Sequence, residues 1–200
     1  MTKDDGLQLL LRDAAKCCEA LGLSDDLIPS IYQSDSDWTF ILKIDALIET
    51  SVKEVIKRSL KLEVNGAFVG DAELEKFISN LPINGRTSLS KLLRATNCDR
   101  DICEFIEATR NVRNAFAHDI QNVGATLLAV IQNRQDWHSL LRRLSPVQNY
   151  DEAEWLKMIQ VDSGILRFSI LQYTLVFLTL AYHIVLKEPP VPLDLKKLAE

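Results

Sequence analysis

The stretch "RNVRNAFAHD", from Arg110 to Asp119, gathers side chains that can act on a phosphate group. Arginine offers a planar fork of donors that matches phosphate oxygens, and histidine accepts or releases a proton near neutral pH. An asparagine next to them can hydrogen-bond either partner. These residue types therefore suit phosphoryl-transfer chemistry, in which an arginine holds the phosphate and a histidine moves a proton.

The spacing limits how these side chains can meet. In a regular helix, five steps of about 100° place Arg113 and His118 roughly 140° apart. Arg110, Asn114 and His118 recur at every fourth position and share one face. Arg113 and His118 converge only if the helix ends or deforms near Ala117, or if a second molecule supplies one of them. The alternative is an exposed helix end, where the C-terminal dipole favours cationic side chains.

Helical patterns surround this stretch. The chain has 200 residues, 47% of them hydrophobic, with few glycines and prolines, and this composition predicts one all-α domain built as a helical bundle. We expect the domain over residues 1–188, with its core at about 37–187, and an extended Pro-rich tail over 189–200. The expected helices are 7–21 with a stop at Gly22, 37–62 capped by Asp37, 72–80, a helix starting at Thr87 or Ser88, 99–118, 123–132 capped by Asn122, and a long terminal helix from near 162.

The last of these helices is unusually apolar. Residues 168–186 include no charged side chain and are long enough to cross a bilayer. However, Gln172, Thr179 and His183 lie along one helical stripe, which favours a helix buried nearly all round in the bundle, with His183 as a hydrogen-bonded core histidine. Membrane association is the alternative.

Charge and cysteine usage exclude several classes of protein. A net charge of -5 argues against binding nucleic acid through bulk positive charge. The N-terminus lacks a secretory signal pattern, so we expect a cytoplasmic protein. The cysteines do not have the spacing of a zinc or redox motif, and we expect reduced, mostly buried thiols at Cys17, Cys18, Cys98 and Cys103. No metal site and no cofactor is expected, because ligand clusters and Gly-rich phosphate loops are missing from the sequence.

The block made of Arg113 and Asn114, three further residues and His118 resembles the Arg-and-His signature of the HEPN superfamily. The segments "DALIETSVKEVIKRSL", "NGRTSLSKLLRAT", "IEATRNVRNAFAHD" and "ILRFSILQYTLVFLTLAYHIVL" are similar, in this order, to the mannitol-repressor-like branch. The resemblance extends over residues 37–186. It implies a helical bundle, usually dimeric, in which the Arg and His of both subunits meet in a cleft.

Catalytic members of that superfamily are metal-independent endoribonucleases, in which attack by the ribose 2'-hydroxyl yields a cyclic phosphate. The resemblance implies that Arg113 stabilises the phosphate, that His118 is the general base or acid, and that Asn114 is the polar residue that follows the arginine. Arg110 lies one turn before Asn114, and from this spacing we infer a second substrate contact.

Two functions remain open at this stage. The first is a homodimeric ribonuclease acting on RNA in a toxin, stress or phage-defence setting. The second is a noncatalytic regulator or interaction module of mannitol-repressor-like type that binds a protein partner, such as an antitoxin. On the long helix, Glu49 can orient Arg113, and Glu49, Lys53, Lys57 and Lys61 form either a solvated stripe or a track for an RNA backbone.

Overall fold

The computed structural model describes residues 3–24, 26–60, 63–64, 67–68, 71–95, 98–145 and 151–183. The expected Pro-rich tail at 189–200 lies outside these residues. The described residues confirm the all-α fold class. The helices are α1 (Lys3–Ala20), α2 (Leu27–Tyr32), α3 (Asp37–Leu60), α4 (Asp71–Asn80), α5 (Leu89–Ala95), α6 (Arg100–His118), the 3-10 helix η1 (Ile120–Gly124), α7 (Leu127–Gln132), α8 (Trp137–Leu144), α9 (Glu152–Val161) and α10 (Gly164–Ala181). Between α3 and α4, β1 (Glu63–Val64) pairs antiparallel with β2 (Ala67–Phe68), with Glu63 opposite Phe68.

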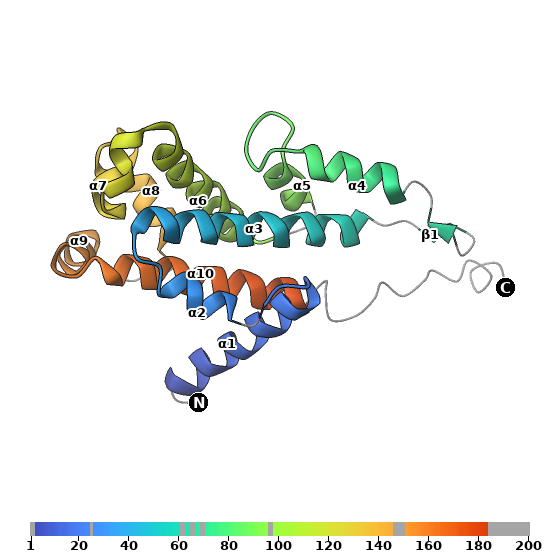
Figure 1. Ribbon diagram of the computed structural model, residues 1–200, viewed down its shortest axis with the longest axis horizontal. Helices are drawn as coiled ribbons and strands as arrows, with labels where there is room; N and C mark the ends of the chain where they lie inside the picture. The colour runs from blue at the N-terminus through green and yellow to red at the C-terminus, as the bar shows by residue number, and fades with distance from the viewer. Residues whose placement is uncertain are drawn as a thin grey trace.

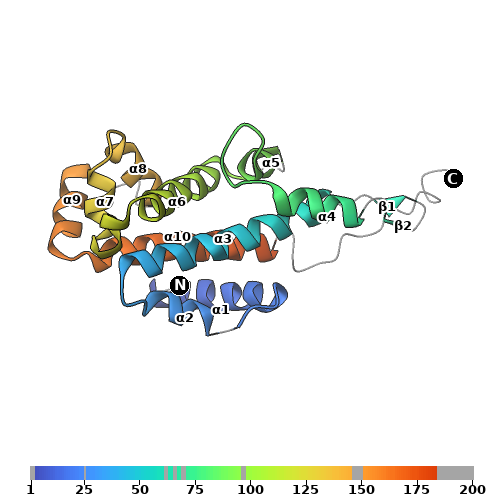
Figure 2. The ribbon, with the colours of Figure 1, turned by 45° about the horizontal axis from the view of Figure 1, so that its top comes forward.

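The long helices form three layers (Figures 1 and 2). α3 and α10 lie side by side in the middle, α1 and α2 cover them on one side, and α4, α5 and α6 cover α3 on the other. The apolar face predicted for α3 is confirmed, because each of its members is at most 5% exposed: Ile41, Ile44, Ile48, Val52, Val55 and Ile56. The middle layer therefore lies at the centre of the core, and α6 is held against one face of α3.

Hydrogen bonds from nearby residues stabilise the ends of the helices, and two of the expected caps are wrong. Gly22 has a φ of 69° and donates to Glu19 O, while Leu23 N donates to Cys18 O, so the predicted stop of α1 is confirmed. Asp37 was expected to cap α3, but Ser36 does so: its hydroxyl accepts from Thr39 N at 3.1 Å. Likewise Thr126, rather than Asn122, caps α7.

Helix α10 is the one helix, among those the structure describes, that is long and apolar enough to cross a membrane. Half of that stretch is buried against its neighbours. Two of its buried hydroxyls have partners within the bundle: Ser169 donates to Ser145 Oγ at 3.2 Å, and Thr174 donates to Ile170 O at 2.9 Å. The buried hydroxyl oxygen of Thr179 has no hydrogen-bond partner among the described residues. The position of α10 in the middle layer agrees with the expected central helix.

His183, expected in the core, lies at its edge instead. Its side chain is 42% exposed, and its Nε2 is 2.7 Å from Oδ2 of the buried Asp13 on α1. The hydrogen bond to His183 lowers the pKa of Asp13, although burial opposes this. The pair joins the middle of α1 to the residues that directly follow α10.

The carboxylate of Asp37 joins three elements. One oxygen pairs with Arg167 on α10, and the other accepts from Leu127 N, the first residue of α7, at 2.6 Å. Arg167 also donates to Ser34 O at 2.8 Å. Both side chains are mostly buried, at 10% and 19% exposure. Asp37 is therefore a tertiary anchor at the start of α3.

Replacing Asp37 with alanine is expected to lower the free energy of unfolding by about 3 kcal/mol, because the Arg167 guanidinium and the Leu127 N–H lose their acceptor while still buried. Urea denaturation at neutral pH measures the loss. Asp35→Ala is the matched control, since Asp35 is exposed, and its effect should stay within about 0.5 kcal/mol. If the two variants lowered the free energy of unfolding equally, this would contradict the role of Asp37 as a tertiary anchor.

Candidate functional site

Helix α6 carries the stretch that contains Arg110 and His118, and it is regular to its last residue. Asp99 caps its start by accepting from Asp101 N and Ile102 N, which confirms the predicted helix start. Its buried face packs on α3 and α8 through Ile102, Cys103, Phe105, Ile106, Ala108, Thr109, Val112 and Phe116. The helix ends at His118, and Asp119 has extended backbone angles.

Arg110 points from α6 onto two carboxylates of α3. Its Nε lies 3.0 Å from Asp45 Oδ1, and its Nη2 donates to Glu49 Oε2. The side chain of Arg110 is 14% exposed, and that of Asp45 only 6%. Glu49 therefore orients Arg110, not Arg113 as its position on the helix suggested.

Arg113 contacts the same buried carboxylate more loosely. Its Nε is 3.6 Å from Asp45 Oδ2, which is an ion pair without a hydrogen bond. Its Nη1 donates to the amide oxygen of its neighbour Asn114 at 3.2 Å. The side chain is 34% exposed. Arg113 therefore has one edge turned toward α3 and part of its surface in contact with solvent.

Burial dominates the electrostatics of Asp45. It raises the pKa of this carboxyl to about 6, although Arg110 and Arg113 lower it, and Glu49 adds to the rise. Burial also opposes ionisation of Glu49, but hydrogen bonds from Lys53 and Arg110 bring its pKa below the ordinary value. At neutral pH both carboxylates are charged and balance the two arginines.

His118 is exposed at the end of α6, and no hydrogen bond or ion pair within the described residues involves it. Because α6 stays helical through Ala117, it does not bend to bring His118 toward Arg113. The structure brings Arg110, Arg113 and Asn114 together with Asp45, and it leaves His118 apart from them. Within one chain Arg113 and His118 do not converge, so a shared site requires a second molecule.

Two residues near this group were missed by sequence reasoning. Asp45 lies between Ile44 and Ile48 on the apolar face of α3, and a carboxylate in an apolar stripe is the signal that should have predicted a buried cation partner. Asn84, from the loop between α4 and α5, donates to Glu107 O at 3.3 Å and to Asn111 Oδ1 at 3.2 Å. No pattern in the sequence indicated Asn84, since its partners are far away along the chain.

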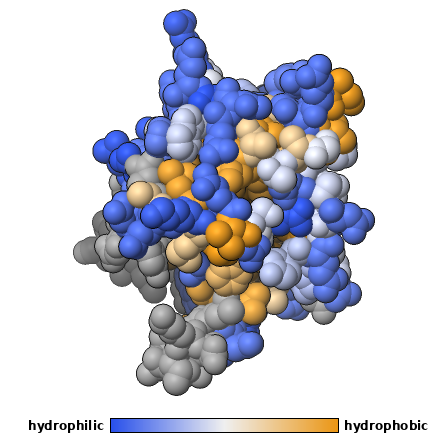
Figure 3. All heavy atoms as spheres, turned by 90° about the vertical axis from the view of Figure 1, so that its left-hand side faces the viewer, coloured by the Kyte–Doolittle hydropathy of each residue, from blue (hydrophilic) through white to orange (hydrophobic). Residues whose placement is uncertain are grey.

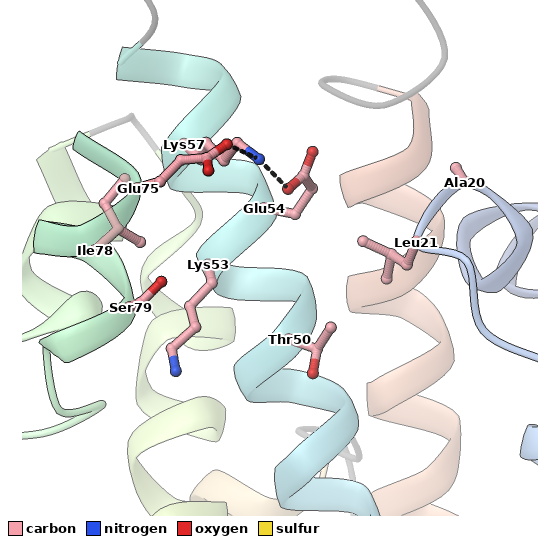
Figure 4. Close-up of a pocket in the computed structure, with 9 residues that line it drawn as sticks. All are labelled: Ala20, Leu21, Thr50, Lys53, Glu54, Lys57, Glu75, Ile78 and Ser79. Atoms are coloured by element: carbon pink, nitrogen blue, oxygen red, sulfur yellow. Dashed lines mark ion pairs between the residues drawn. The ribbon is translucent and has the colours of Figure 1, made fainter. Parts of the chain in front are cut away.

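The lysines of the charged stripe on α3 are paired with carboxylates. Lys53 contacts Glu49 at 2.7 Å, and Lys57 contacts both Glu54 at 3.6 Å and Glu75 of α4 at 2.6 Å. Figure 4 shows Lys53, Lys57, Glu54 and Glu75 around a groove between α3, α4 and the end of α1, with a volume of about 360 Å³. Lys61 lies outside the described residues. The described part of the stripe is an ion-paired surface, which does not favour an RNA track.

No protein family, curated protein or solved structure matches this chain. Among the described residues, no group of three or more His, Cys, Asp or Glu side chains is placed to hold a metal ion. The side chains available for chemistry at this site are therefore those of Arg113, Asn114 and His118, together with the carboxylates that position the arginines.

The raised pKa of Asp45 predicts a specific pH dependence of stability. Between pH 3.8 and about 6 the folded chain keeps a proton on Asp45 that the unfolded chain releases, so its contribution to stability falls as pH rises. Compared with Asp45→Asn, the wild type should lose up to about 3 kcal/mol of unfolding free energy over this range. Urea denaturation at several pH values measures the difference, and parallel pH profiles for the two proteins would contradict it.

The two arginines are expected to differ in their effect on stability. Arg110→Met leaves two carboxylates without their buried partner and should cost about 3 kcal/mol of unfolding free energy. Arg113→Met removes a longer and more exposed pair, so it should cost less than about 1 kcal/mol. Denaturant midpoints of the two variants, measured side by side at neutral pH, provide the comparison. If Arg113→Met lowered the free energy of unfolding more than Arg110→Met, then Arg113 rather than Arg110 would be the arginine that stabilises the fold.

Proposed function

We propose that the protein is a HEPN-type, metal-independent endoribonuclease whose active site forms between two copies of the chain. The observation that supports this proposal is that Arg113 is partly exposed and only weakly held by its neighbours. This arginine is one-third exposed and is oriented by Asn114 and Asp45 without a strong bond to either. It can therefore rotate its guanidinium toward a phosphate at little cost, whereas Arg110 cannot.

The division of roles follows from the contacts of each side chain. Arg113 would bind the scissile phosphate and stabilise the charge that develops on its oxygens. Asn114 would hold the guanidinium in place through its amide oxygen. Arg110 was expected to contact substrate, but its two carboxylate partners favour a structural role, in which it fixes α6 against α3.

In the reaction that the resemblance implies, the ribose 2'-hydroxyl attacks the adjacent phosphorus. The bond from phosphorus to the 5' oxygen breaks, leaving a cyclic phosphate and a free 5' hydroxyl. His118 would take the proton of the 2'-hydroxyl as general base, since its imidazole is exposed and can reach the substrate. The leaving oxygen needs a proton in return, and a water molecule at this exposed position could donate it.

A noncatalytic interaction module remains the second proposal, and a different observation favours it. Large apolar side chains are exposed at the end of the molecule where α6 stops. Figure 3 shows apolar atoms among polar ones on this face. The exposed large hydrophobic residues of η1, α9 and α10 are Ile120, Val123, Met158, Val161, Phe168 and Leu180. Ile120 and Val161 are 85% and 88% exposed. Such a surface also suits a protein partner of a regulator.

Incubation of the purified protein with single-stranded RNA in the presence of a chelator tests the enzyme proposal. Arg113→Ala and His118→Ala should each lower cleavage at least about a hundredfold, since each removes a group that acts on the transition state. His138→Ala and Arg142→Ala are matched controls with exposed positions on α8 and should keep wild-type activity. Absence of cleavage on RNAs of varied sequence would leave the interaction module as the better proposal.

Mixing the two inactive variants tests the shared site. In a dimer that takes Arg113 from one chain and His118 from the other, a mixed pair has one intact site, so the mixture should recover about a quarter of the wild-type rate. Two variants that stay inactive after mixing, while native mass spectrometry shows that mixed dimers have formed, would contradict this arrangement. A monomer at micromolar concentration would contradict it as well.

A further inference from the structure

The start of α6 holds two cysteines in positions that face each other. Asp99 is the N-cap, since its carboxylate accepts from Asp101 N at 2.8 Å. Cys98 therefore comes directly before the N-cap, and Cys103 is in the second turn, at the fourth residue of the helix. In helices that begin this way, the side chains at these two positions pack against each other across the first turn. This contact is usually made by two aliphatic residues, but here both are thiols.

A side-chain hydrogen bond links Cys98 and Cys103 and affects the pKa of both thiols. The Cys103 thiol donates to the sulfur of Cys98, which lowers the pKa of Cys98, while burial and Asp99 oppose this and a backbone hydrogen bond at Asp99 assists it. The same contact, together with burial, raises the pKa of Cys103. Around Cys103, Arg94 favours the thiolate and Glu107 disfavours it.

The pair differs in exposure in the way that a reacting dithiol requires. Cys98 is partly exposed and can meet a reagent from solvent, whereas Cys103 is fully buried behind it. The other two cysteines, Cys17 and Cys18, are both fully buried in α1, and burial raises the pKa of Cys17 to about 12. Cys98 is therefore the cysteine of this chain that we expect to react first.

We propose that Cys98 and Cys103 are a redox modification site, at which they form a reversible disulfide that closes the first turn of α6. This inference goes beyond the proposed ribonuclease and does not depend on it. The free thiols are the reduced form of the site, and a small disulfide such as oxidised glutathione is a suitable oxidant.

The reaction proceeds by two exchanges. The Cys98 thiolate attacks one sulfur of oxidised glutathione, so a bond forms between these two sulfurs and one glutathione leaves as a thiolate. The Cys103 sulfur then attacks the Cys98 sulfur, releasing its proton to solvent and expelling the second glutathione as a thiolate. The two cysteines together lose two electrons, which the oxidised glutathione gains. After the first exchange Cys98 is no longer a thiolate, so the hydrogen bond that disfavours ionisation of Cys103 is lost.

The test uses the full chain incubated with oxidised glutathione, then denatured, alkylated and digested with trypsin for mass spectrometry. Arg100 lies between the two cysteines, so trypsin separates their peptides in the reduced chain and leaves them joined when the disulfide is present. We expect one joined peptide pair, lighter by two hydrogens than the sum of its parts, which dithiothreitol separates again. Cys17 and Cys18 serve as internal controls and should remain alkylated in the same sample.

Two variants identify the order of attack. Cys103→Ala should stop at a glutathione adduct on Cys98, and Cys98→Ala should leave Cys103 reduced, with circular dichroism used to verify that both variants fold. The wild-type result stands by itself if a variant fails to fold. The proposal is overturned if wild-type Cys98 and Cys103 both stay reduced under excess oxidant, if a stable glutathione adduct accumulates on wild-type Cys98, or if either cysteine pairs with Cys17 or Cys18 instead.

Discussion

The buried carboxylate of Asp45 is the constraint on which the geometry of the candidate site depends. It lies on the apolar face of α3, where an unpaired charge would be too costly to keep. Arg110 and Arg113 both reach it from α6, one at 3.0 Å and the other at 3.6 Å. Because both arginines must face α3, the rotation of α6 about its own axis is set, while His118 is the last residue of the helix and is exposed.

The shared carboxylate also separates the roles of the two arginines. Arg110 has Asp45 and Glu49 as partners, and Glu49 is itself paired with Lys53, so this guanidinium belongs to a closed ion-pair network. Arg113 makes the longer of the two contacts with Asp45, and part of its side chain is exposed to solvent. The proposed function requires such an arginine, because its donors must be available to a phosphate.

The two ends of α6 have different chemistry. Its start is held by the Asp99 cap and by the contact between Cys98 and Cys103, and its end presents His118 next to exposed apolar residues of η1. Since α6 is one continuous helix packed on α3 and α8, a covalent bond at its start would restrain the first turn of the element that carries Arg113 and His118.

The sequence by itself determined most of the helices, the apolar face of α3, the Asp99 cap and the stop at Gly22. These features depend on hydrogen bonds and side-chain periodicity within a few residues, which a short window of sequence contains. The HEPN resemblance, by contrast, remains a proposal that rests on the Arg113, Asn114 and His118 block.

Only the tertiary structure decided which charges meet. Asp37 leaves the cap of α3 to Ser36 and binds Leu127 and Arg167 instead, and Glu49 pairs with Arg110 rather than Arg113. Asp45 was visible as an acidic residue in an apolar stripe, but its partners lie on another helix, far along the chain. Such pairings depend on how two helices are rotated and placed against each other, and the packing of their whole buried faces determines this.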